Sequence, residues 1–277
     1  MDLNTIAEVK RPTSADQIGQ WRPGYAWLAG GTWLFSEPQV ATDTLIDLDQ
    51  LHWPALEPST AGLRIAATCH IAELYKFVGP DAWRATPLFR ACCNSFLASF
   101  KIWNAATVGG NICMSLPAGP MISLTVGLEA TYTLWPRDAA PREVAGVDFV
   151  TGNHANVLQP GELLRSIHLP ASALSKRFAF RHASLTKLGR SAALLIGTRS
   201  NAADDLLLTI TAAVPRPIQL RFAHMPSETQ LRRAIDEHIP ADGYFNDVHG
   251  SADYKRHLTY YFAEQIRVEL AQSGAAQ

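Results

Sequence analysis

The sequence predicts an α+β protein, and three observations lead to this fold class. Up to Pro170 the chain holds short apolar runs of strand length, separated by Gly and Pro. Beyond Pro170 the pattern changes to further runs in which apolar and polar residues alternate. From Ser227 onward the pattern becomes mostly helical. We therefore expect two parts, residues 1–170 and residues 171–277, with subdomains of about 1–58 and 59–170 in the first.

Length and composition describe an ordinary globular chain. Of the 277 residues 47% are hydrophobic and 18% are charged, and the formal net charge is −1. Wholesale disorder does not fit this composition, and scattered Lys and Arg give no surface for nucleic-acid phosphates. No run approaches the roughly 20 apolar residues of a membrane span, and the first residues are too charged for a secretory signal. We expect a cytoplasmic chain with no nucleic acid and no membrane span.

In the first part, most elements follow from apolar patterning between turn residues. Ser14 to Gln17 has the spacing of a capping box, which predicts a short helix ending near Gln20. Residues 71–100 show the apolar spacing of helices, with an interruption at Pro80. Residues 122–129 form another expected helix. Strands are expected at residues 25–29, 44–48, 62–67, 131–135 and 163–169.

In the second part, three strands and two helices are expected. The strands lie at residues 178–184, 192–196 and 206–212. The helices cover residues 227–238 and about 251–270.

The cysteines and histidines predict no metal site and no catalytic group on this chain. Cys69, Cys92, Cys93 and Cys113 form no C-x-x-C pair and no zinc or iron–sulfur spacing. Reduced thiols that pack as small hydrophobes explain them. The order of the residues suggests no Ser/His/Asp or Cys/His arrangement either.

Two segments with paired glycines are the candidate ligand loops. They are Ala29-Gly30-Gly31-Thr32 and Thr107-Val108-Gly109-Gly110-Asn111, and each follows an apolar element. Glycine lets the backbone approach a ligand closely, so successive N–H groups can form a concave nest for a pyrophosphate. Each pair is also explained by a plain tight turn, and the spacing leaves both readings open.

Together with other stretches, these segments resemble the flavin-binding subunit of the xanthine dehydrogenase and carbon monoxide dehydrogenase family. Residues 28–34, LAGGTWL, resemble the family's AGGTDL loop, and residues 102–111, IWNAATVGGN, resemble its IRNxATxGGN loop. Pro117-Ala118, GELL at 161–164 and GSADYKR at 250–256 follow in the family's order. The resemblance covers nearly the whole chain. It implies a two-lobed FAD-binding module of the vanillyl-alcohol oxidase (PCMH) type over residues 1–170. It also implies a C-terminal domain with a small antiparallel sheet and helices.

The resemblance also implies an FAD whose pyrophosphate lies between the two glycine loops. Leu97, Ala98, Ser99 and Ile102 would lie near the flavin ring, and Arg181, or Lys187 if the alignment shifts, would supply a cation there. The implied cofactor contacts are Leu28, Ala29, Gly30, Gly31, Thr32, Trp33, Leu34, Leu97, Ala98, Ile102, Ala106, Thr107, Gly109, Gly110, Asn111, Cys113, Gly119, Pro120, Leu164 and Arg181.

Three positions depart from the family pattern. Trp33 replaces the acid of AGGTDL, Trp103 replaces the arginine of IRN, and Pro120 stands where the family has an acid that contacts the ribose. The last change removes a hydrogen-bond acceptor worth roughly 1 kcal/mol. We expect the backbone nests to keep the cofactor bound.

The function implied by the resemblance is that of an electron relay. Electrons from a molybdopterin centre on a large partner would cross 2Fe-2S clusters on a small partner and reach this FAD, in a heterotrimer or its dimer. NAD, oxygen or another acceptor would then receive them. The alternatives are a stand-alone flavin oxidoreductase and a non-redox scaffold subunit that has lost FAD.

Overall fold

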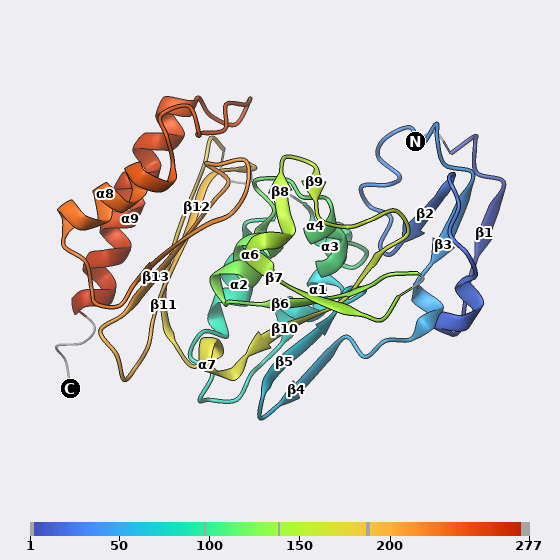
Figure 1. Ribbon diagram of the computed structural model, residues 1–277, viewed down its shortest axis with the longest axis horizontal. Coiled ribbons are helices and arrows are strands. Elements are labelled where there is room, and N and C mark those ends of the chain that lie inside the picture. The colour runs from blue at the N-terminus through green and yellow to red at the C-terminus, as the bar shows by residue number, and fades with distance from the viewer. Residues whose placement is uncertain (1–2, 97, 138, 187–188, 273–277) are drawn as a thin grey trace.

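The protein is an α+β molecule, which confirms the predicted fold class. The computed structural model describes residues 3–96, 98–137, 139–186 and 189–272. Three sheets follow one another along its longest axis: a small N-terminal sheet, a central sheet with helices, and a C-terminal sheet covered by two helices (Figure 1). None of the helices in this described part is both long and apolar enough to cross a membrane.

The N-terminal sheet is parallel and has the strand order β1-β3-β2. Its strands are β1 (Glu8–Lys10), β2 (Tyr25–Leu28) and β3 (Thr44–Asp47), with short 3-10 helices η1 (Ala15–Ile18) and η2 (Asp49–Leu51) between elements. The expected capping box at Ser14 is wrong, because its side chain makes no capping bond. Instead, Gln17 Oε1 accepts a hydrogen bond from the Thr13 amide at 2.8 Å.

The central sheet is antiparallel, with the order β4-β5-β10-β6-β7. Its strands are β4 (Leu56–Ser59), β5 (Gly62–Ala66), β6 (Thr131–Trp135), β7 (Arg142–Ala145) and β10 (Leu163–Pro170); β8 (Val150–Gly152) and β9 (Ala155–Asn156) form a separate hairpin. The helices of this region are α1 (Ile71–Lys76), α2 (Pro87–Asn94), α3 (Phe100–Trp103), α4 (Val108–Cys113), α5 (Pro120–Gly127), α6 (Gly146–Phe149) and α7 (Ala171–Leu174).

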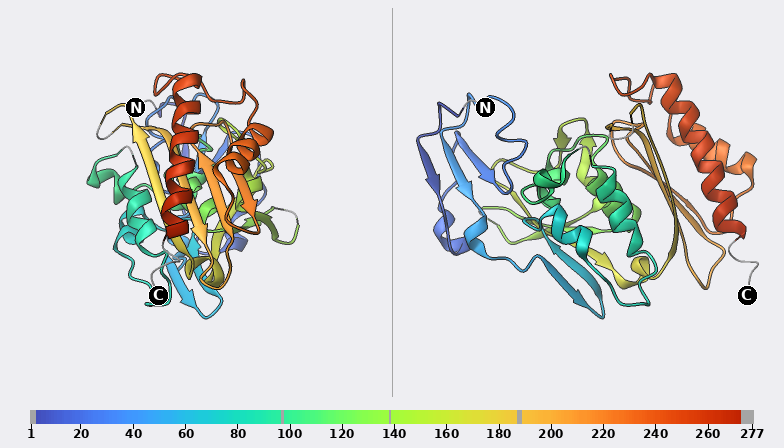
Figure 2. Two further views of the ribbon diagram at one scale, coloured as in Figure 1. Left: turned by 90° about the vertical axis from the view of Figure 1, so that its left-hand side faces the viewer. Right: turned by 180° about the vertical axis from the view of Figure 1, so that it is seen from behind.

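The C-terminal sheet is antiparallel and lies between helices on both faces (Figure 2). Its elements are β11 (Arg177–Ser184), β12 (Ser191–Arg199), β13 (Leu206–Thr211), β14 (Ile218–Phe222), α8 (Glu228–His238) and α9 (Ala252–Gln272). Helix α9 packs on one face and α5 on the other, which explains why β12 and β13 are buried almost throughout.

Helix α5 joins the central region to the C-terminal sheet. All eight of its residues are buried. Ser123 Oγ lies 2.6 Å from Thr211 Oγ1, and Gly127 leaves room for Ile196 of β12. The central core therefore includes side chains from beyond Pro170, and the division expected at that proline stays a prediction.

Candidate functional site

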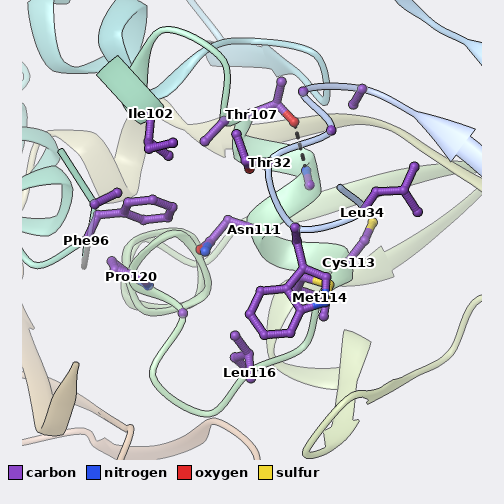
Figure 3. A pocket seen from close by; sticks show the side chains of 18 of the residues that line it. Thr32, Leu34, Phe96, Ile102, Thr107, Asn111, Cys113, Met114, Leu116 and Pro120 are labelled. Atoms are coloured by element: carbon purple, nitrogen blue, oxygen red, sulfur yellow. Dashed lines mark hydrogen bonds between the residues drawn. The ribbon is translucent and has the colours of Figure 1, made fainter. Parts of the chain in front are cut away.

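A cavity of about 440 Å³ lies where the loop after β2 meets α4, α5 and the 95–102 segment (Figure 3). A pocket of this size, mostly apolar with a few polar groups, is typical of a small-molecule or cofactor site. Its lining residues are Trp27, Ala29, Gly30, Gly31, Thr32, Trp33, Leu34, Ser95, Phe96, Ala98, Ile102, Ala106, Thr107, Gly110, Asn111, Cys113, Met114, Leu116, Ala118, Gly119, Pro120 and Arg190.

The first glycine loop is a single turn with free amides. The Phe35 amide donates to the Gly31 carbonyl at 2.8 Å, and Gly31 has a φ of +67°, which favours glycine. The backbone N–H groups of residues 30–34 donate to no acceptor within the described part of the chain. Because these residues line the cavity, their amides are available to an anionic ligand.

Hydrogen bonds from the following residues hold this loop in place. The Trp33 carbonyl accepts bonds from the amide and the hydroxyl of Ser36, both at 2.8 Å. Gln39 Nε2 donates to the Leu34 carbonyl at 2.8 Å. The loop is thus ordered before any ligand binds, which lowers the entropic cost of binding.

The second glycine pair is not a turn, as the sequence suggested, but the first turn of α4. The Val108 amide donates to the Cys69 carbonyl and the Gly109 amide to the Ala67 carbonyl. The Gly110 amide donates to Thr107 Oγ1, which caps the helix at 3.1 Å (Figure 3). These amides are already engaged, so the nest expected here is wrong, and the Thr107 hydroxyl remains as a donor.

Asn111 adds a second side-chain donor and connects α4 to α5. Its Oδ1 accepts a hydrogen bond from the Met121 amide at 3.0 Å. This bond supplies a cap that α5 lacks, because Gly119 at the N-cap has no side chain and Pro120 has no N–H. The bond also fixes the amide group, leaving Nδ2 without an acceptor among the described residues.

The two glycine segments touch, and glycine is needed at the contact. A Cβ on Gly30 would lie 1.8 Å from the Ala105 carbonyl oxygen. A Cβ on Gly109 would lie 2.5 Å from the Cβ of Ala67. The first approach brings the loop against the segment that leads into α4, and the second brings α4 against the residue that follows β5.

The walls of the cavity are apolar at both ends and polar in the middle. In Figure 3, Phe96 and Ile102 lie on one side and Leu34 and Cys113 on the other, with Thr32 and Asn111 between them. Burial raises the pKa of the Cys113 thiol to about 12, so this wall is uncharged at neutral pH.

Arg190 is the one charged side chain among the described lining residues. It makes no ion pair within the described chain. No carboxylate therefore repels an anion from the described walls of this cavity, and one cation attracts it.

The structure brings most of the sequence-predicted site residues to this cavity. They are Ala29, Gly30, Gly31, Thr32, Trp33, Leu34, Ala98, Ile102, Ala106, Thr107, Gly110, Asn111, Cys113, Gly119 and Pro120. Leu97 and Lys187 lie outside the described residues.

Five predicted residues lie elsewhere, and Ser99 is one of them, at the N-cap of α3. Leu28 pairs with Asp47 in the parallel sheet, and Gly109 packs on Ala67. Leu164 is 1% exposed in the central core.

Arg181 is the fifth, and it does not line the cavity. Its guanidinium bonds to Gln265 at 2.8 Å and to Glu269 at 2.6 Å, both on α9. Arg190 supplies the cation at the cavity instead.

Sequence reasoning missed seven lining residues: Trp27, Ser95, Phe96, Met114, Leu116, Ala118 and Arg190. Phe96 adjoins the predicted 97–98 pair, and Met114 to Ala118 connect the second glycine motif to Pro120, so proximity in sequence was a usable signal. Nothing in the pattern around Arg190 marked it.

The cysteines pack as expected for small hydrophobes. Cys69, Cys92 and Cys93 are buried in the central core, and burial raises their thiol pKa values. No three His, Cys, Asp or Glu side chains of the described chain gather so that they could hold a metal ion.

Comparison with known proteins gives consistent matches. The family described as the FAD binding domain in molybdopterin dehydrogenase matches residues 5–172. Caffeine dehydrogenase subunit beta of Pseudomonas sp. strain CBB1 is 26% identical over 256 residues, covering 86% of this chain and 82% of that protein. The carbon monoxide dehydrogenase medium chain of Afipia carboxidovorans is 31% identical over 138 residues, covering 50% of this chain and 44% of that protein.

Among solved structures, quinoline 2-oxidoreductase from Pseudomonas putida 86 shares the fold. The TM-score is 0.79 at 19% identity, with 96% of this chain and 97% of that chain covered. The family match spans more than half of the chain, including both glycine segments and all but one of the described lining residues. The chain therefore belongs to the family of FAD-binding domains found in molybdopterin dehydrogenases.

Proposed function

We propose that the cavity holds FAD and that the chain relays electrons within a molybdopterin dehydrogenase complex. The observation that carries this proposal is the run of free amides at residues 30–34, set between two apolar ends. FAD has the matching chemistry, because a doubly anionic pyrophosphate joins two aromatic ring systems.

The protein groups divide the task of binding. The first loop supplies backbone donors to the pyrophosphate, and the Thr107 hydroxyl and the Asn111 amide add side-chain donors from α4. Arg190 balances negative charge. The acid missing at Pro120 removes one ribose contact, and the same change removes a negative charge from the cavity wall.

The flavin would supply the electron-transfer chemistry, and the protein would position it and exclude water. The relatives are named as a subunit beta and a medium chain, which supports the proposal that this chain works beside others. We propose a large molybdopterin-binding partner and a small 2Fe-2S partner. The clusters would deliver electrons to the flavin, and NAD, oxygen or another acceptor would take them.

Co-purification with partners tests this function. The chain expressed with its neighbours should carry flavin absorbance, and the complex should contain iron and molybdenum. The isolated chain should bind FAD but turn over only with artificial electron donors and acceptors.

Two outcomes would overturn the proposal. A chain that shows no flavin absorbance and takes up no added FAD would be a non-redox scaffold. An isolated chain that oxidises an organic substrate without partners would be a complete flavin oxidoreductase.

A further inference from the structure

We propose that Trp33 is the stacking platform for the adenine ring of FAD. The inference rests on the proposed FAD site and assigns each ring of FAD to one end of the cavity. The adenine would lie at the end formed by Trp33, Leu34, Cys113 and Met114, and the isoalloxazine at the end formed by Phe96 and Ile102.

Trp33 is held at its end of the cavity by backbone and ring contacts. Its carbonyl accepts both Ser36 bonds, and its ring lies 5.8 Å from the ring of His154 at an interplanar angle of 46°. His154 in turn donates its amide to the Ser115 carbonyl at 3.0 Å. The indole is therefore placed beside the segment that carries Met114.

The β8–β9 hairpin is bonded to the segment that follows Cys113 at this end of the cavity. Asn156 Nδ2 donates to the Cys113 carbonyl and to Ser115 Oγ, both at 3.0 Å. An end lined by sulfur and aromatic groups suits the stacking of an adenine ring.

The opposite end has the properties that a redox-active ring needs. Phe100 on α3 is 71% exposed and Ile102 is 39% exposed. An apolar rim at the surface gives an electron-transfer partner access to the ring.

The side chain of Trp33 is free to serve a ligand. It is half-buried, it lines the cavity, and its indole N–H has no acceptor among the described residues. Stacking of a base on an aromatic side chain depends on little more than a flat apolar face, which Trp provides. The N–H can donate to a ribose hydroxyl or a phosphate oxygen at the same time.

Binding of the two halves of FAD tests the inference. The full chain, stripped of flavin, is titrated with FAD, with ADP and with FMN, and Trp33→Ala and Trp33→Phe are compared with the wild type. Trp33→Ala should weaken ADP and FAD by roughly tenfold or more. FMN affinity should stay within about twofold of wild type, and Trp33→Phe should keep most of the ADP affinity.

Tryptophan fluorescence gives a second measurement. ADP should change the emission of the wild type and of the control Trp53→Phe, whose ring lies against Trp135 rather than in the cavity. The change should be much smaller in Trp33→Phe, a variant that keeps an aromatic ring and leaves Trp27 as the remaining tryptophan among the described lining residues.

The possible failures are separable. A wild-type chain that binds no FAD would refute the proposed function itself. Normal FAD binding together with unchanged ADP affinity in Trp33→Ala would refute the adenine platform alone. A loss confined to FMN would place the isoalloxazine at Trp33 and reverse the proposed direction.

Discussion

Gly30→Ala should weaken FAD binding strongly through a collision between the two ligand segments. The added Cβ would lie 1.8 Å from the Ala105 carbonyl oxygen, whereas real Cβ contacts stay beyond 3.0 Å. The first loop must therefore move away by about 1 Å, which carries its amides out of the 2.7–3.2 Å range of good hydrogen bonds.

The expected loss follows from the bonds that break. Losing two amide bonds to a charged pyrophosphate, at about 1.5–3 kcal/mol each, weakens binding by about 3–6 kcal/mol. That range corresponds to roughly a 10²- to 10⁴-fold rise in the Kd for FAD. Quenching of flavin fluorescence measures Kd, and circular dichroism shows whether the variant is folded at the assay temperature.

Gly152→Ala is the matched control for this experiment. The nearest atom to its added Cβ is the Cβ of Ala155, at an ordinary 3.8 Å, so the same change causes no collision. A folded Gly30→Ala variant whose Kd lies within about threefold of the control would refute the close contact between the two segments.

Three further predictions test two residues of the cavity and one buried ion pair. Asn111→Asp keeps the acceptor for the Met121 amide but loses the donor and adds a negative charge. FAD affinity should fall about tenfold or more while Tm changes by less than about 3 °C; a normal FAD titration would contradict this. Gly110→Val, whose Cβ meets the capping hydroxyl at 2.9 Å, should lower the flavin-to-protein absorbance ratio sharply and leave the C-terminal sheet folded; unchanged occupancy would place the pyrophosphate elsewhere. Glu162→Gln should cost about 2 kcal/mol of unfolding free energy at pH 7, because it breaks the bidentate bond to Arg142. Burial raises the pKa of Glu162, but the guanidinium more than offsets this and holds it below its usual range. The stabilisation is therefore complete above about pH 5 and is lost as the pH falls through the lowered pKa. Urea unfolding of both proteins at pH 7 and below about pH 4 should show the difference shrink, and a constant difference would refute the assignment.

The sequence predicted elements well where local pattern and tertiary packing agree. Residues 131–135 form the expected strand without any shift in bounds, because alternation in the sequence matches a sheet with one buried face. The helix expected at residues 227–238 is also confirmed, and the structure shows a capping box at its start, where Gln230 and Ser227 exchange both bonds. At Ser14 the same spacing failed, because Gln17 bonds to Thr13 instead.

The site could be predicted where its geometry requires glycine. It could not be predicted where hydrogen bonds to residues distant in sequence determine whether a group is free. The first loop was visible because Gly30 and Gly31 meet close-approach and positive-φ requirements that other residues cannot. The Gly109-Gly110 pair misled, because strand-end carbonyls at Ala67 and Cys69 take up amides that sequence alone shows as free. Arg181 misled for a similar reason, since its partners on α9 lie more than eighty residues away.

The structure of the chain with FAD bound tests the central claim most directly. We predict pyrophosphate oxygens within hydrogen-bond distance of backbone amides between Gly30 and Leu34, with Thr107 and Asn111 on the opposite side. We also predict the isoalloxazine beside Phe96 and Ile102. A pyrophosphate held at the N-terminus of α4 with the first loop unbound, or an FAD outside this cavity, would contradict it.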